Sequence, residues 1–220
     1  RSTLFPYTTL FRSLADIMEK FFKFNKTEKS NPALIERAER ARECLARLGL
    51  TFDDLKGKRT LEIGAGTAEI AEAVQGKGAT VFSLDLKPEM WLEEEKNPDV
   101  PYVKANAMAL PFSGETFDLI ISHAGPFVLV SLKESVKKMI LEAKRALKSG
   151  GELRFGPGNL NAAIFKEGEL FSPMEEGKLT TEQRVGRIEK KSLEFLWSID
   201  KNIQQRNLDD FSHFYFLKKQ

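Results

Sequence analysis

The segment from Leu61 to Thr67, which reads LEIGAGT, has residue types that suit close contact with a ligand. It follows a predicted strand and precedes a predicted helix, and a glycine turn in that position commonly forms a ligand site. Gly64 and Gly66 allow the backbone to approach a ligand because neither has a Cβ atom. The predicted contacts in this turn are Gly64, Ala65, Gly66 and Thr67.

Two carboxylates decide between the two classes of ligand that bind at such turns, dinucleotides and S-adenosylmethionine (SAM). A dinucleotide turn has a third small residue where this chain has Glu69, and a carboxylate there would obstruct helix packing and repel a pyrophosphate. Glu62 lies two residues before the first glycine, where the end of the strand directs it into the same cavity. Its charge would repel phosphate and attract the α-ammonium group of a methionine moiety. These residues therefore favour SAM as the cofactor.

A second acidic residue, Asp85, ends the next apolar run about twenty residues after the glycine turn. A carboxylate at this position can accept hydrogen bonds from both ribose hydroxyls. Leu86 beside it offers an apolar face to adenine. This spacing is shared with nicotinamide-dependent enzymes, so it predicts a nucleoside ligand without choosing between the two classes.

If SAM is the cofactor, its sulfonium carries a leaving group that is already activated, so the site needs an aligned nucleophile more than an elaborate set of catalytic groups. His123 follows the fourth predicted strand and would project at the carboxyl edge of the sheet, where it could act as a general base or orient the acceptor. It could equally cap the strand end without touching substrate. Phe127 is either a wall of the substrate site or a core residue, with core favoured.

Charge and cysteine content exclude several classes of protein. Cys44 is the single cysteine and there are two histidines, so no zinc cluster and no internal disulfide is expected, and Cys44 is interpreted as a helix-packing residue. Arg1 and Arg12 lie in residues 1–13, which we interpret as a non-native segment. Without them the number of Lys and Arg residues falls from 34 to 32, equal to the 32 Asp and Glu residues. A neutral chain favours neither a nucleic-acid nor an anionic membrane surface. No apolar run is long enough to span a bilayer, and we expect a cytoplasmic location.

The elements that must position these residues alternate between short apolar runs and helical segments. Strands are predicted at 59–63, 80–84, 100–104, 117–122 and 151–155, and helices at 67–75, 88–96 and 132–147, the last with a capping box of Ser131 and Glu134. Later, a helix is expected to begin at the cap formed by 180–183, and two strands at 193–198 and 213–217. Such alternation predicts a parallel sheet with helices on both faces.

The chain is expected to divide into three parts. We interpret residues 1–13, Arg1 to Ser13, as a translated sequencing adapter, because codons for these residues spell such an oligonucleotide in one frame. Residues 14–50 hold an amphipathic stretch and then a helix with Asn31 as N-cap, and are interpreted as an N-terminal helical lid. Residues 51–220 form the cofactor-binding domain.

In order along the chain, five segments resemble the motifs of small-molecule class I SAM-dependent methyltransferases. They are Leu61 to Thr67, Asp85, Ala105 to Phe112, Phe117 to Ser122 and Leu147 to Gly151. The resemblance covers about residues 58–155. It implies a Rossmann-like, doubly wound and mostly parallel sheet of about seven strands in the order 3-2-1-4-5-7-6.

The resemblance also assigns Asn106, Ala107 and Ser122 to the cofactor site. The family usually has Asp at the position of Asn106, whose amide oxygen can still accept a hydrogen bond from the adenine amino group. A third glycine is common where this chain has Ala68, and we expect little cost because alanine suits the first turn of a helix.

The function implied is methyl transfer from SAM to an oxygen, nitrogen or carbon atom of a small molecule. A protein or nucleic-acid methyltransferase and a non-catalytic partner subunit are the alternatives. The segment from Ser122 to Pro126 lacks the Asn-Pro-Pro-Tyr type of motif used on planar nitrogens, and it lacks the cysteine needed to methylate a cytosine ring. The acceptor and the oligomeric state cannot be predicted from the sequence.

Overall fold

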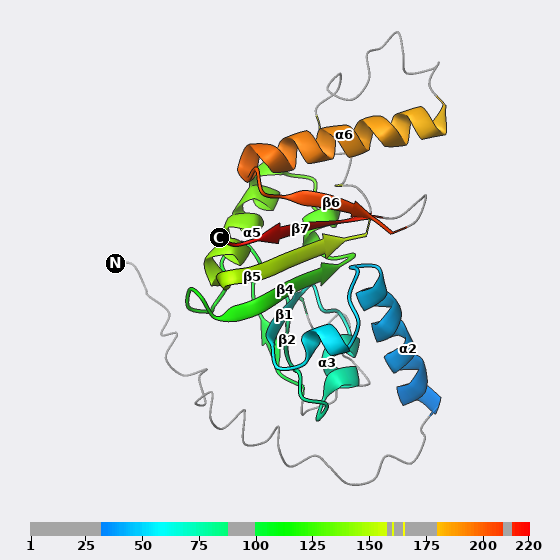
Figure 1. Cartoon of the computed structure of the whole chain (residues 1–220), viewed down its shortest axis with the longest axis vertical. Helices are drawn as coiled ribbons and strands as arrows, with labels where there is room; N and C mark the ends of the chain where they lie inside the picture. The colour runs from blue at the N-terminus through cyan, green and yellow to red at the C-terminus, as the bar shows by residue number, and fades with distance from the viewer. Residues whose placement is uncertain (1–31, 88–99, 158–159, 161–164, 166–179, 209–212) are drawn as a thin grey trace.

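In the computed structural model a seven-stranded sheet has the order β3-β2-β1-β4-β5-β7-β6, which confirms the predicted order (Figure 1). The structure describes residues 32–87, 100–157, 160, 165, 180–208 and 213–220. The strands are β1 (Arg59–Ile63), β2 (Thr80–Asp85), β3 (Tyr102–Lys104), β4 (Phe117–His123), β5 (Leu147–Gly156), β6 (Gln204–Asn207) and β7 (His213–Lys218). The first five are parallel, and β7 runs antiparallel between β5 and β6.

Helices cover both faces of this sheet. On one face lie α2 (Pro32–Ala46) and α3 (Glu69–Val74), with the short 3-10 helix η2 (Asp53–Leu55) between α2 and β1. On the other lie α4 (Pro126–Leu129), α5 (Lys133–Ala146) and α6 (Thr181–Ile199). This is the doubly wound arrangement expected from the βαβ alternation.

The alternation of side chains along β1 decides which residues reach which face. Leu61 and Ile63 belong to the core beneath α5, so Glu62 between them is directed to the face covered by α2 and α3. The second core contains α2 residues such as Leu45 together with Ile121 of β4. The sheet is thus buried on both sides, as parallel sheets are.

Two local predictions are wrong, and one short helix was not predicted. Residues 193–198, predicted as a strand, lie inside α6, and the strand before β7 is instead β6. The N-cap of α5 is Leu132 and makes no side-chain cap hydrogen bond, so the capping box at Ser131 does not form. Residues 126–129, which lie in none of the predicted elements, form one helical turn in α4, for which Pro126 at the first turn is suited.

The capping box predicted at Thr180 is confirmed. The Thr180 hydroxyl accepts from the Gln183 N–H, and the Gln183 side chain accepts from the Thr180 N–H at 2.9 Å. Two donors at the start of α6 are satisfied in this way.

Several predictions concern residues outside the described ranges. These are the adapter segment 1–13, the amphipathic stretch at 14–24, the N-cap at Asn31 and the helix at 88–96. The described part of the expected lid is α2, which packs against α3, and its role as a lid stays a prediction. Among the described residues, no helix has the length and apolar character needed to cross a bilayer.

Candidate functional site

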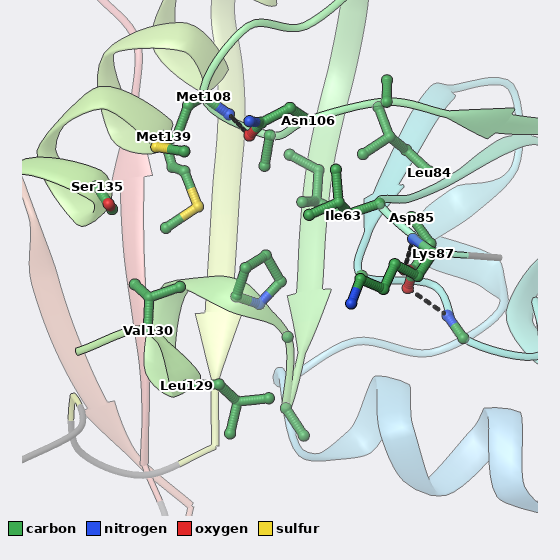
Figure 2. A pocket seen from close by; sticks show the side chains of 18 residues that line it. Ile63, Leu84, Asp85, Lys87, Asn106, Met108, Leu129, Val130, Ser135 and Met139 are labelled. Carbon is green, nitrogen blue, oxygen red and sulfur yellow. Dashed lines mark hydrogen bonds between the residues drawn. The ribbon is translucent and has the colours of Figure 1, made fainter. Parts of the chain in front are cut away.

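A pocket of about 520 Å³ opens at the carboxyl ends of the parallel strands, within the usual size range of small-molecule sites (Figure 2). Its lining contains six of the residues predicted to bind the cofactor: Gly64, Gly66, Asp85, Leu86, Asn106 and Ala107. The structure therefore brings together the ends of β1 and β2 and the segment after β3, from which these residues were predicted to bind one cofactor.

The glycine turn directs its N–H groups into the protein. The amides of Gly64 and Ala65 both donate to the Leu84 carbonyl, at 2.8 and 3.1 Å. The Gly66 amide donates to Asp85 Oδ2 at 3.2 Å. Gly64 and Gly66 have φ values of 76° and 51°, a left-handed conformation that glycine adopts without strain. The turn is thus tied to β2 through its amides.

Asp85 ends β2 with both carboxylate oxygens facing donors. Oδ1 accepts from the Lys87 N–H at 3.0 Å, and Oδ2 accepts from Gly66 (Figure 2). A carboxylate oxygen has two lone-pair sites, so each oxygen can accept one further hydrogen bond. Leu86 beside it is 55% exposed and lines the pocket, so its apolar face is open to a flat ring.

Asn106 lines the same pocket as Asp85, and the Ala105 amide before it donates to the Asp85 carbonyl at 3.0 Å. Asn106 Oδ1 accepts from the Met108 N–H at 2.9 Å, which fixes the amide in one orientation. The second lone pair of Oδ1 can still accept a hydrogen bond from an amino group. This geometry is compatible with the predicted contact to adenine.

Glu62 does not line this pocket, although it lies two residues before Gly64. Its side chain is 6% exposed, and Oε2 has no hydrogen-bond partner in the described part of the protein. Burial, with a smaller contribution from the charge of Glu69, raises the pKa of Glu62 to about 8. A buried carboxylate without a cation is costly, and such groups are candidates for ligand contacts.

Ala65, Thr67, Ser122 and His123 also do not line the pocket. The Ser122 hydroxyl is buried and donates to the Ile63 carbonyl at 2.8 Å, so it links β4 to β1. His123 is half-buried, with Nε2 unpartnered among the described residues. Burial, and then the charge of Arg47, lower the pKa of His123, so its imidazole is neutral at neutral pH. A contact of either residue with a ligand stays a prediction.

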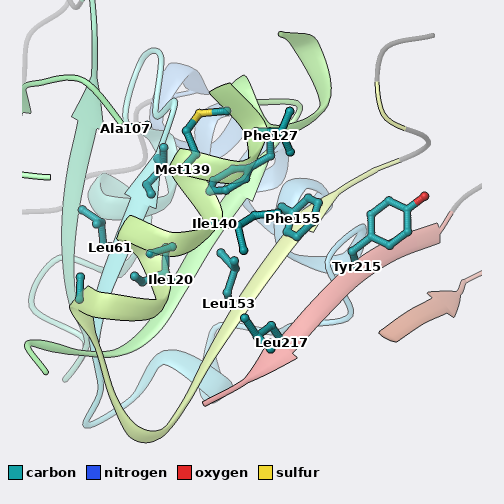
Figure 3. Close-up of a cluster of buried hydrophobic side chains, with 14 of the residues drawn as sticks. Leu61, Ala107, Ile120, Phe127, Met139, Ile140, Leu153, Phe155, Tyr215 and Leu217 are labelled. Carbon is teal, nitrogen blue, oxygen red and sulfur yellow. The ribbon is translucent and has the colours of Figure 1, made fainter. Parts of the chain in front are cut away.

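Sequence reasoning missed the part of the pocket formed by α4 and α5. Leu129 ends α4 and Val130 follows it, and Ser135 and Met139 lie one helical turn apart on α5 (Figure 2). Met139 also belongs to the buried core (Figure 3). The i, i+4 spacing indicates one helix face, but no signal in the sequence says that this face meets the glycine turn.

Two interpretations of single residues are confirmed. Phe127 is 1% exposed and stacks on Phe155 with ring centroids 5.0 Å apart, so it is a core residue (Figure 3). Cys44 packs against the core beneath α2, and burial, followed by the charges of Glu62 and Glu69, raises its pKa to about 11. A thiol with that pKa is a poor nucleophile at neutral pH.

The expectation for Ala68 is wrong. Ala68 is the N-cap of α3 and has φ 59° and ψ 34°, the left-handed conformation, and not a position in the first turn of the helix. For a residue with a Cβ this conformation costs roughly 1–2 kcal/mol. The third glycine common at this position would avoid that cost.

Comparison with known proteins agrees with the strand order and the glycine turn. Residues 61–155 match the family model described as a methyltransferase domain. A provisionally assigned SAM-dependent methyltransferase of Methanococcus maripaludis superposes with a TM-score of 0.51 at 16% identity, covering 89% of this chain and 97% of that one. Human N-acetylserotonin methyltransferase, solved with SAM, gives a TM-score of 0.50 at 13% identity, covering 93% of this chain and 65% of that one. Residues 61–155 are thus similar in sequence to methyltransferase domains, and the chain has the fold of these solved structures.

Relatives in sequence match mainly this domain. The demethylmenaquinone methyltransferase of Renibacterium salmoninarum is 33% identical over 98 residues, which is 44% of this chain and 40% of that protein. An uncharacterized protein of Methanocaldococcus jannaschii is 26% identical over 188 residues, 74% of this chain and 72% of that protein. The chain spans about 40% of the length of the first of these relatives.

Proposed function

We propose that this protein transfers a methyl group from SAM to a small-molecule acceptor. The main observation behind the proposal is that Glu62, whose buried Oε2 has no hydrogen-bond partner among the described residues, lies just before the glycine turn. The α-ammonium group of the methionine moiety is the cation that this carboxylate would bind. The chemistry supplied by bound SAM is an activated methyl group, and the chain's own residues hold and orient the two substrates.

The hydrogen bonds of the turn argue against a dinucleotide. A pyrophosphate binds to N–H groups that point at it. Here the amides of Gly64, Ala65 and Gly66 already donate to Leu84 and Asp85. A phosphate at this turn would meet few free donors and the carboxylate of Asp85.

The proposed site divides into a nucleoside half and an acceptor half. Asp85 would accept from the ribose hydroxyls, Leu86 would contact adenine, and Asn106 would accept from the adenine amino group. Leu129, Val130, Ser135 and Met139 would form the acceptor half. Three of these four side chains are apolar, which favours an uncharged acceptor with one polar group near Ser135.

The nature of the acceptor also draws on the relatives. The Renibacterium protein is named for demethylmenaquinone, which is in keeping with an apolar acceptor. His123, with its pKa lowered, would serve as a neutral base only after its ring turns toward the acceptor. If the ring does not turn, the acceptor must lose its proton without help from His123.

Isothermal titration with S-adenosylhomocysteine (SAH), the product of methyl transfer, tests the proposal. We expect saturable binding with one site per chain, and no displacement by millimolar NAD⁺. Circular dichroism on the same sample establishes that the protein is folded. Absence of SAH binding to folded protein, or tighter binding of NAD⁺, would overturn the proposal.

A further inference from the structure

Two side chains from outside the pocket donate hydrogen bonds to the carbonyl groups of the glycine turn. The Tyr102 hydroxyl, at the start of β3, donates to the Gly66 carbonyl at 2.7 Å. Arg37 Nη2, from α2, donates to the Thr67 carbonyl at 3.0 Å. These two carbonyls follow one another along the chain, so consecutive peptide groups are held by side chains from β3 and α2.

Tyr102 keeps its proton at neutral pH, and Arg37 is held in a fixed orientation. Burial, followed by the charges of Asp85 and Glu62, raises the pKa of Tyr102 above its ordinary value, so the hydroxyl stays protonated. Arg37 is 9% exposed and forms an ion pair with Glu72 of α3, which fixes its guanidinium beside the turn. Neither side chain lines the pocket.

The turn needs such support because its backbone is unusual. Gly64, Gly66 and Ala68 all have positive φ, and Ala68 pays a steric cost for it. Regular hydrogen bonding of the β1 ladder ends at Ile63, and α3 begins only at Glu69. Between them the amides of Gly64, Ala65 and Gly66 are bonded to β2, and the carbonyls of Gly66 and Thr67 are bonded to Tyr102 and Arg37.

We infer that Tyr102 and Arg37 are positioning residues that hold the glycine turn in its cofactor-binding conformation. This inference rests on the proposed function, because it takes SAM or SAH as the ligand. When one of these hydrogen bonds is removed, only a fraction of the molecules keeps the turn in the conformation that binds cofactor. The apparent affinity for SAH then falls in proportion to that fraction. The helix α2, outside the segment that matches the family model, thereby contributes to cofactor affinity.

Substitution Y102F tests this inference with little change in shape, because only the hydroxyl is removed. We expect the dissociation constant of SAH to rise about fivefold, as the loss of one hydrogen bond allows. The matched control is Y215F, which removes a buried hydroxyl beside His213 on β7, and it should leave SAH affinity unchanged. Equal SAH affinity in Y102F and the unsubstituted protein would overturn the inference.

Arg37 is tested by R37M, which keeps the apolar stem, and by R37K, which keeps a donor for the Thr67 carbonyl. We expect R37M to weaken SAH binding by about fivefold to tenfold and R37K to restore most of that loss. The control on the same helix is R42M, whose exposed Arg42 pairs with Glu39, and it should bind SAH normally. Failure of R37K to restore binding, with both variants folded, would contradict a role for the hydrogen bond to Thr67.

A measurement on the ligand-free protein separates this inference from the proposed function. In protein labelled with ¹⁵N-glycine, Y102F should shift and broaden the Gly66 amide signal and accelerate its hydrogen exchange, with Gly150 on β5 as an unaffected reference. An unchanged Gly66 signal would overturn the inference even where SAH binds. If the unsubstituted protein does not bind SAH but Y102F changes the Gly66 amide signal, the proposed function is refuted. The conclusion that Tyr102 holds the glycine turn is then still supported.

Discussion

Replacement of Glu62 by glutamine should stabilise the free protein at pH 8 while it weakens cofactor binding. The side chain keeps its shape in E62Q, but the buried charge is lost. Since Oε2 of Glu62 has no partner among the described residues, ionisation in the folded state is unfavourable. A residue that costs stability in the free protein and binds a ligand cation is expected at a functional site.

The size of the effect follows from the pKa of Glu62, which burial raises from 4.5 to about 8. Below pH 4.5 both folded and unfolded chains hold the proton, and the carboxyl group has no pH-dependent cost. Between pH 4.5 and 8 the unfolded chain releases the proton and the folded chain keeps it, so stability falls by about 1.4 kcal/mol per pH unit. The total loss of stability between pH 4.5 and pH 8 is at most roughly 5 kcal/mol, and water around the carboxylate would reduce it.

Urea unfolding at pH 5, 6.5 and 8 measures this difference. We expect the free energy of unfolding of E62Q to exceed that of the unsubstituted protein by an amount that grows from pH 5 to pH 8. The control E36Q changes an exposed carboxylate on α2 and should not alter the pH dependence. A less stable E62Q at pH 8, or a difference independent of pH, would refute the argument that Glu62 is buried without a partner.

The same titration predicts how cofactor binding depends on pH. In the free protein Glu62 is protonated at pH 6, and an ammonium group binds the ionised form. SAH affinity should therefore rise by up to about tenfold per unit between pH 6 and 7.5, with release of a proton on binding. In E62Q this dependence should disappear, which calorimetry in buffers of different ionisation enthalpy can measure.

The other predictions concern the cofactor site, the backbone of the turn and the cysteine. D85N should raise the dissociation constant of SAH by about tenfold to a hundredfold, because it removes a charged acceptor, and calorimetry measures this. A68G should raise the free energy of unfolding by about 0.5–1 kcal/mol by relieving the left-handed conformation, whereas A71G, inside α3, should lower it by about 1 kcal/mol in the same urea titration. Cys44, with its pKa raised to about 11, should react with a thiol reagent at pH 8 far more slowly in the folded protein than in urea, and equal rates would contradict its burial.

Much of the fold could be predicted because local signals and tertiary structure agree in the first half of the chain. The bounds of β1 match the prediction at 59–63, since a short apolar run is followed at once by a glycine turn. The prediction of a late strand at 193–198 was wrong because a short apolar run does not distinguish a strand from a buried helix face. β6, with the sequence QQRN, is a polar edge strand and carries no hydrophobic pattern that could identify it.

The candidate site was predictable where a residue type is tied to a strand end. Asp85 could be found in this way, because the end of a parallel strand fixes the position of the side chain, whereas Glu62, predicted by the same reasoning, does not line the pocket. Tyr102 and Arg37 could not, since each contacts the turn from about 30 residues away or more and neither belongs to a motif. Long-range hydrogen bonds of this kind depend on packing that no local pattern encodes.

A crystal structure of the protein with bound SAH tests the central claim most directly. The account predicts that the homocysteine ammonium nitrogen lies about 3 Å from a carboxylate oxygen of Glu62, with the ribose hydroxyls on Asp85. An ammonium group held elsewhere, with the carboxylate of Glu62 still buried and unpartnered, would contradict it.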